Sequence, residues 1–418
     1  MRKAFWISGW VCLWVLAWGV PGFSADLNEL QRRIDVLTDE IENFKMQGGG
    51  GGEPDRVKLH GYGELHFNHR PQGGRTEVDL HRFVIGIHAL LTDWIHLNAE
   101  IDFEHGAQEL EFEFGYLDFL IQQSFNVRAG VMLLPVGFLN EFHEPPLFWS
   151  VERPELQTKI IPTTWNGSGV GIFGTPFEGV NYRIYAVNSV QSIRPLGFGS
   201  GDGVGGGGQS GQFRAKDGIR KGRLQPNVAI AEDFAAVGRL ELTSLYPGLQ
   251  LGFSFYTGET TQNIINEGGR ILLLEGDVKY RLRWFEMNAT IVNIDVDDAA
   301  AINTYCTAVN VVTAGTCSAD VPDNIFGWNI QAGVHIPQLL GLNTTQDLVP
   351  FFLFERIRPQ DSLPSGTAPS HKSNFNVFTM GISYMPIAEV ALKADYQHFK
   401  TGDSKSHDQF NMGIAYMY

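Results

Sequence analysis

The sequence lacks most of the features that mark an enzyme or a helical membrane protein. Apart from one apolar run near the amino terminus, Ala4–Val20, it has no apolar stretch of about 20 residues, so no later segment is expected to cross a membrane as a helix. It has no GxSxG, HExxH or phosphate-loop pattern, and acid–base pairs such as His143 and Glu144 arise too readily by chance to indicate catalysis. We therefore expect no enzyme and no cofactor. Any membrane span after the first run must be built from the strands of a closed barrel.

Positive charge is scarce as well. The chain has 31 Lys and Arg against 46 Asp and Glu, a net charge of −15, and removal of Arg2 and Lys3 would take −15 to −17. Such a balance argues against a nucleic-acid partner.

Arg2 and Lys3 open a segment with the layout of a secretory leader. They precede the apolar run, which ends in Pro21 and then a small residue, Ala25, suited to cleavage. We therefore predict a signal peptide over residues 1–25. An uncleaved anchor is the alternative, although the run is short for a spanning helix.

Cysteine is nearly absent from the exported chain. Of three cysteines, Cys12 leaves with the leader, while Cys306 and Cys317 stand eleven positions apart in a polar stretch. In an oxidising periplasm we expect these two to form one disulfide that closes a small loop. Two free thiols, or half of a metal site, are the alternatives.

Residues 26–47 differ from everything downstream. Their apolar residues follow a heptad pattern with charged residues between them, namely Leu27, Leu30, Ile34, Leu37, Ile41 and Phe44. We predict a periplasmic helix, too short to be stable alone, that forms a coiled coil in an oligomer or lies on another surface. Five glycines, Gly48–Gly52, then open a flexible linker over residues 48–56.

From Val57 onward the apolar residues recur with a period of two. Leu97, Ala99 and Ile101, for example, alternate with polar residues, as in strands with one apolar face. About sixteen such runs, joined alternately by short turns and long connections, predict an all-β transmembrane antiparallel barrel over residues 57–418. Fourteen or eighteen strands are alternatives. A barrel of this size encloses an aqueous lumen.

The chain ends on an aromatic-rich strand, FNMGIAYMY. Its alternate residues are large and apolar or aromatic, namely Phe410, Met412, Ile414, Tyr416 and Tyr418. This ending resembles the terminal insertion signal of bacterial outer-membrane barrels, which implies the barrel-insertion machinery as a partner. We expect the strand to face lipid and lipopolysaccharide and to pair with the strand beginning near Val57. The last strand of a soluble sandwich is the alternative, which the leader disfavours.

On each strand, the charged residues occupy the alternate positions that face away from lipid, so they define the expected lumen wall. A Lys or Arg side chain facing lipid at the middle of the bilayer would cost about 2–4 kcal/mol. The acidic positions lie on two neighbouring strands: Glu100, Asp102, Glu104, Glu109, Glu111 and Glu113. The basic positions are Arg128, Arg183, Arg239, Lys279, Arg281 and Arg283. Opposed acidic and basic ladders would set a transverse field that screens solutes by charge. Alternatively, the charges pair and only hydrate the wall.

Three connections are too long for turns: Pro135–Gly167, residues 190–230 and residues 297–324. The first is rich in Pro, Trp and Phe, which predicts a loop folded into the lumen, although an outer lid or a contact between protomers is possible. Its candidate constriction residues are Glu141, Glu144, Glu152, Arg153, Glu155 and Lys159.

Four inward histidines, His60, His66, His88 and His96, would bind a metal only if they lay at one level. We expect these histidines only to line the lumen, and we assign no metal site.

The segment Tyr116–Gly174 carries a family resemblance. Its VRAGVMLLPVG and IIPTTWNGSGVGIFG stretches, together with the leader, heptad helix and aromatic ending, resemble the phosphate-selective porin O/P-like family. The resemblance implies a trimeric, passive channel whose phosphate selectivity rests on a ladder of lumen arginines and lysines. Here only Lys279, Arg281 and Arg283 are ladder-like, and the acidic face departs from that pattern.

These patterns together predict an outer-membrane porin that passes small hydrophilic solutes or ions by diffusion. The alternatives are a specific channel for an anion such as phosphate or for a divalent metal, and a structural barrel that encloses envelope partners.

Overall fold

The computed structural model describes residues 56–418 except residues 73, 194–211, 225–228, 314–316 and 371. The predicted leader, the heptad helix and all but the last residue of the glycine-rich linker lie outside the described residues.

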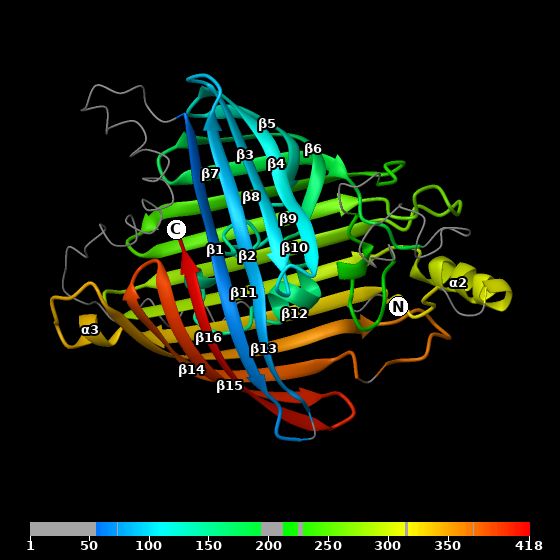
Figure 1. Cartoon of the computed structure of the whole chain (residues 1–418). Coiled ribbons are helices and arrows are strands. Elements are labelled where there is room, and N and C mark those ends of the chain that lie inside the picture. Colours follow the sequence, from blue (N-terminus) through cyan, green and yellow to red (C-terminus); the bar gives the residue numbers. More distant parts are fainter. Residues whose placement is uncertain (1–55, 73, 194–211, 225–228, 314–316, 371) are drawn as a thin grey trace. The chain divides into compact units, whose positions relative to one another are not determined.

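Sixteen antiparallel strands form one closed barrel in chain order, and β1 pairs with β16 to complete the ring (Figure 1). They are β1 (Val57–His69), β2 (Thr76–Leu90), β3 (Ile95–Glu104), β4 (Glu109–Gln122), β5 (Phe125–Leu133), β6 (Asn166–Phe177), β7 (Val180–Asn188), β8 (Phe234–Tyr246), β9 (Leu249–Gly258), β10 (Ile271–Arg281), β11 (Phe285–Val296), β12 (Asn324–Val334), β13 (Asp347–Ser362), β14 (Phe375–Ile387), β15 (Val390–Thr401) and β16 (Ser406–Met417). The predicted fold class and strand number are confirmed.

Short helices lie in the connections. They are η1 (Pro145–Leu147), η2 (Leu156–Ile160), η3 (Arg220–Gly222), α2 (Ala299–Thr313) and α3 (Ile336–Leu339). None of the described helices is long and apolar enough to cross a membrane. α2 and α3 lie at opposite ends of the barrel (Figure 1), because odd-to-even and even-to-odd connections emerge at opposite ends. We call the end that carries α2 the long-loop end and the other the short-turn end.

The closing seam uses the terminal strand as expected. β1 and β16 pair from Tyr62 opposite Met417 to His69 opposite Phe410. Tyr418 lies just beyond the strand but extends the seam, because its N–H donates to the Gly61 carbonyl at 2.8 Å. A Cβ on Gly63 would lie 2.6 Å from the Tyr416 hydroxyl, so glycine at this position leaves room for the tyrosine on the outer face.

The outer surface carries the apolar half of the alternation. On β16, Phe410, Met412 and Ile414 are exposed while Asn411 between them is fully buried. The same pattern of exposed apolar residues recurs around the ring, for example at Phe253, Phe255, Leu272, Leu274, Met380, Ile382 and Leu392. An outward apolar face over a closed ring is what a lipid-spanning barrel requires.

The inward face changes character along the barrel. On β10, Ile271 and Leu273 near the long-loop end point inward and are fully buried, and Glu275 and Asp277 follow at the same parity. A buried apolar cluster therefore fills part of the long-loop end, and it includes Tyr185, Val237, Tyr256, Val292, Ile294 and Ile325 from the strands. On the strands that contribute to this cluster, the polar lining predicted from sequence begins farther from the long-loop end, as it does at Glu275 on β10.

One local expectation was wrong, and one helix was not foreseen. β10 ends at Arg281 because Leu282–Trp284 form a tight turn in which the Leu282 N–H donates to the Phe285 carbonyl at 2.7 Å. Arg283 therefore lies exposed in a turn and is not part of a lumen ladder. Within the long connection of residues 297–324, in which no helix was predicted, residues 299–313 form α2.

The signal for α2 was present but was overlooked. Its buried residues Ala299, Ile302, Cys306 and Val309 are spaced by three and four positions, which is a helical period.

Candidate functional site: the lumen and its inner loop

The connection between β5 and β6, residues 134–165, lies against strands on the far side of the ring as well as on its own side. We call it the inner loop. Its η1 packs near β1, β15 and β16, and its η2 packs against β12 and β13, although the loop begins and ends at neighbouring strands. The loop therefore crosses the lumen before returning.

The far-wall anchor of the inner loop is a carboxylate. Glu355 on β13 accepts hydrogen bonds from the N–H groups of Glu155 and Leu156, both at 2.9 Å, at the start of η2. The side chains of Leu156 and Ile160 are fully buried. Gly327 on β12 leaves space for them, since a Cβ there would lie 2.5 Å from Leu156 Cδ1.

A second anchor uses a buried ammonium group. Lys393 Nζ on β15 donates to the carbonyl oxygens of Pro145, at 2.6 Å, and Ser150, at 2.9 Å. The same Nζ lies 4.0 Å from the centroid of the Phe148 ring. Two positions along β15, an Asp395 carboxylate oxygen accepts the Val151 N–H at 2.6 Å. Backbone polar groups of the loop thus find partners in the wall, as burial requires.

The near wall holds the loop through histidines. His143 Nε2 lies 2.7 Å from the Tyr62 hydroxyl and 3.1 Å from Glu113 Oε2. Glu152 Oε1 lies 3.2 Å from His66 Nδ1 and accepts from Asn68 at 2.8 Å. These contacts link the loop to β1 and β4.

The six constriction candidates all lie on the inner loop, in partly buried positions. Glu141 pairs with Arg183 at 3.3 Å, and Arg153 donates to the His143 carbonyl at 3.4 Å. Burial raises the pKa of Glu144 and of Glu155, and burial together with the charge of Arg82 lowers the pKa of Arg153 to about 10. Lys159 ends η2.

The acidic candidates lie close together on two neighbouring strands, β3 and β4. Glu100, Asp102 and Glu113 are buried on the lumen side, and ligand oxygens of Glu104, Glu109 and Glu111 lie within 4.8 Å of one another. A residue that the sequence analysis did not single out organises them. The buried guanidinium of Arg82 on β2 lies 3.4 Å from Glu64, 3.7 Å from Asp102, 3.0 Å from Glu104 and 3.5 Å from Glu113.

The basic candidates are largely neutralised by carboxylates. Arg128 forms a two-pronged pair with Asp118 at 2.7 and 2.9 Å. Arg183 lies 3.1 Å from Glu241, and Arg239 lies 2.9 Å from Glu241 and 2.7 Å from Asp277. This arrangement favours the alternative in which lumen charges pair.

The remaining two basic candidates on β10 also have neighbours. Lys279 Nζ lies 4.3 Å from the Phe138 ring centroid, so this cation contacts the inner loop. Arg281 lies 3.6 Å from Glu286 of β11.

A small opening lies beside the acidic face. It is lined by Glu111, Glu113, Thr164, Asn166 and Arg223. Arg223 donates to the Thr163 carbonyl, so the connection between β7 and β8 contacts the inner loop at this point.

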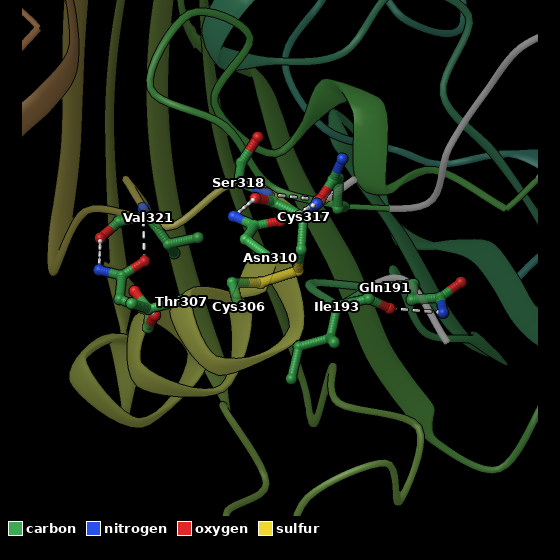
Figure 2. The surroundings of a disulfide bond; sticks show 10 residues. Gln191, Ile193, Cys306, Thr307, Asn310, Cys317, Ser318 and Val321 are labelled. Atoms are coloured by element: carbon green, nitrogen blue, oxygen red, sulfur yellow. Dashed lines mark hydrogen bonds between the residues drawn. A yellow bond between two sulfur atoms is a disulfide. The ribbon is translucent and has the colours of Figure 1, made fainter. Parts of the chain in front are cut away.

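The long-loop end is closed in part by two further connections, which dock on each other. Cys306 of α2 and Cys317 form a disulfide with a Cα–Cα distance of 5.0 Å. Figure 2 shows Asn310 bridging the loop, since it donates to the Cys317 carbonyl at 2.7 Å and accepts the Cys317 N–H at 2.9 Å. The Ser318 N–H donates to Gln212 Oε1 at 2.9 Å, which joins residues 297–323 to the described part of residues 189–233.

The four inward histidines are not at one level. His88 and His96 contact edge to face near the short-turn end, whereas His66 lies near the long-loop end. They therefore do not form the single metal site considered from sequence.

Comparison with known proteins agrees with this architecture. No family model matches the chain. A protein of Aquifex aeolicus (strain VF5), described as uncharacterized, is 30% identical over 370 residues, which cover 87% of this chain and 80% of that protein.

Solved structures share the fold at low identity. OmpF of Salmonella typhi, in complex with daunomycin, has a TM-score of 0.55 at 10% identity and covers 87% of this chain and 97% of that one. The outer membrane channel DcaP of Acinetobacter baumannii has a TM-score of 0.53 at 9% identity, with 87% and 97% covered. An anion-selective porin from Comamonas acidovorans has a TM-score of 0.50 at 11% identity, with 87% and 99% covered. The chain therefore has the fold of bacterial outer-membrane barrels, which agrees with the predicted location.

Proposed function

The chain belongs to the same family as the Aquifex aeolicus protein, and from its barrel and lumen we propose that it is a porin with a lumen narrowed by the inner loop. Small hydrophilic solutes and ions would cross by diffusion, without a cofactor. The observation that carries this proposal is the path of residues 134–165 across a sixteen-stranded ring. A ring of that size is wide enough for water, and an anchored loop would restrict the solutes that pass.

We propose a preference for cations over anions. At the acidic face, one guanidinium, Arg82, serves four carboxylates, while the described arginines on β5, β7 and β8 are each paired with acids. The negative charge in excess would raise the local concentration of cations and repel anions. A phosphate-selective lumen would require the reverse balance, so we do not extend that property of the resembling family to this chain.

Planar-bilayer recording of the purified protein tests this proposal. In a salt gradient the reversal potential should have the sign of cation preference. Glu111→Gln, at the opening beside the acidic face, should reduce that preference, whereas Glu389→Gln in the short turn between β14 and β15 should not. A reversal potential of the anion-selective sign would contradict the proposed preference.

A structural barrel without conductance is the second candidate. It is favoured by the apolar cluster at the long-loop end, which fills space that an open pore would leave to water. Absence of conductance from correctly folded protein would support it.

We further propose that the protein assembles as a homotrimer through its outer face and the heptad helix, as the family resemblance implies. Deleting residues 26–47 should weaken oligomers on unheated gels. Oligomers of unchanged stability would show that the helix does not contribute.

A further inference from the structure

We propose that Asp79, His81 and His105 form a binding site for a divalent transition-metal ion of the zinc type at the long-loop end of the barrel. Asp79 Oδ2 lies 3.2 Å from His81 Nδ1 and 2.8 Å from His105 Nδ1. One ligand atom from each of the three residues lies within 4.8 Å of the other two. Bonds of about 2.0–2.1 Å in a tetrahedral site place ligand atoms roughly 3.3 Å apart, so small side-chain movements suffice.

Two backbone irregularities bring these side chains together. The pairing of β1 with β2 shifts by one residue, with Glu64 opposite Arg82 but Leu65 opposite Leu80, so His81 occupies a bulge. The bulge re-aims His81 toward Asp79 on the lumen side, a common role of bulges beside functional sites.

The second irregularity is the turn between β3 and β4. His105 and Ala107 have φ values of 51° and 69°, in the left-handed region that residues with a Cβ rarely adopt. The turn folds back onto the bulge, because the His105 N–H donates to the His81 carbonyl and the Gly106 N–H to the Leu80 carbonyl, each at 3.1 Å. This strained backbone conformation thus places the imidazole of His105 beside the carboxylate of Asp79.

The chemistry of the three ligands selects the class of ion. Two imidazoles with one carboxylate suit Zn²⁺, Ni²⁺ or Cu²⁺ better than Mg²⁺ or Ca²⁺, which prefer oxygen ligands. The side chains of His81, Asp79 and His105 are 30%, 34% and 42% exposed, so an ion and its remaining water ligands have access.

The surroundings connect this site to the inner loop. The His81 ring stacks on His66 with centroids 4.7 Å apart, and His66 Nδ1 lies 3.2 Å from Glu152 of the inner loop. Metal binding would therefore bear on the position of the loop. The site itself is independent of the proposed porin function, because it requires only the folded barrel.

Metal binding to the full-length, tag-free barrel in detergent tests the proposal. After removal of metals, isothermal titration with Zn²⁺ should show one site per chain. His105→Ala and Asp79→Asn should each weaken binding at least about ten-fold, while the control His398→Ala should leave it unchanged. His398 is a fair control because its Nδ1 lies 2.7 Å from Asp408, a similar pair for which no third ligand was found among the described residues.

A spectroscopic signature distinguishes a built site from weak binding. Co²⁺ should give the visible absorption of a four-coordinate ion in the wild type, and the band should be lost in His105→Ala. Heat-modifiable migration on gels shows whether each variant is folded. If His105→Ala does not fold, His105→Asn is used in its place. No Zn²⁺ binding, or binding that survives both substitutions, would show that these residues form only a hydrogen-bonded cluster.

Discussion

At the scale of single residues, the interior is organised by buried charges that contact several partners. Arg82 is the clearest case, since four carboxylates from three strands surround one guanidinium that is 4% exposed. Sequence parity predicted Glu100, Asp102 and Glu113 on the lumen side, and all three are buried. It could not single out Arg82, because the pairing depends on strand register and on the bulge beside Glu64.

Replacing Arg82 should strongly destabilise the barrel. Arg82→Met would leave buried carboxylates without their cation, and removal of one partner of such a buried group costs about 3–5 kcal/mol. The free energy of unfolding can be measured by urea-dependent folding into detergent or lipid. Arg270→Met is the matched control, because the Arg270–Glu259 pair at 3.8 Å is exposed and should contribute less than about 1 kcal/mol. Equal losses would contradict the assigned role of Arg82.

The ion preference should fall on acidification. Burial raises the pKa of Glu144 and of Glu155, so these carboxylates lose their charge at a higher pH than an exposed glutamate. As pH falls, protonation removes negative charge from the inner loop, and the reversal potential should move toward zero before ordinary carboxylates titrate. Substituting both residues with Gln should abolish the change in reversal potential that occurs at the higher pH values. A profile unchanged by that double substitution would show that other groups set the preference.

At the scale of elements, the strands were predictable and the connections were less so. Alternation of apolar and polar residues identified sixteen strands because lipid and lumen impose opposite demands on the two faces. Strand ends were harder, as Arg283 shows, because a turn retains the alternation for a few residues. The inner loop was expected in the lumen from its Pro, Trp and Phe content. Its anchors Glu355 and Lys393 were not foreseen, since they lie 200 and 248 residues away from their partners in the sequence.

The anchor at Glu355 should be important for holding the inner loop. Glu355→Ala would leave the N–H groups of Glu155 and Leu156 without acceptors, at a cost of about 1–3 kcal/mol each if they remain buried. We expect a lower free energy of unfolding and faster proteolysis within residues 134–165. Glu355→Gln retains one acceptor oxygen and should have a smaller effect. If Glu355→Ala resists proteolysis as well as the wild type does, other contacts hold the loop.

The disulfide should stabilise one loop rather than the whole barrel. A cross-link between residues eleven positions apart lowers the conformational entropy of the unfolded chain, which stabilises the folded loop by about 3 kcal/mol. In the variant with Cys306→Ser and Cys317→Ser, limited proteolysis should cut within residues 297–323 while the barrel keeps its heat-modifiable migration. Protection of this segment equal to that of the wild type would contradict the prediction.

At the scale of the whole molecule, we propose that the inner loop narrows a conducting barrel. Leu133 pairs with Asn166 across β5 and β6, so the two ends of the loop are neighbours and a short turn can replace residues 138–162 without opening the ring. The apolar cluster at the long-loop end includes Leu156, Ile160 and Ile161 of the inner loop, so the replacement also removes part of what fills the lumen.

Single-channel conductance of the wild type and of this shortened variant tests the claim most directly. We expect a small, measurable conductance for the wild type and a conductance several-fold larger for the variant, with both proteins shown to be folded by their gel migration. Equal conductances would show that the loop does not constrict the pore. A wild type that never conducts, beside a variant that does, would identify the inner loop as a plug and the native barrel as closed.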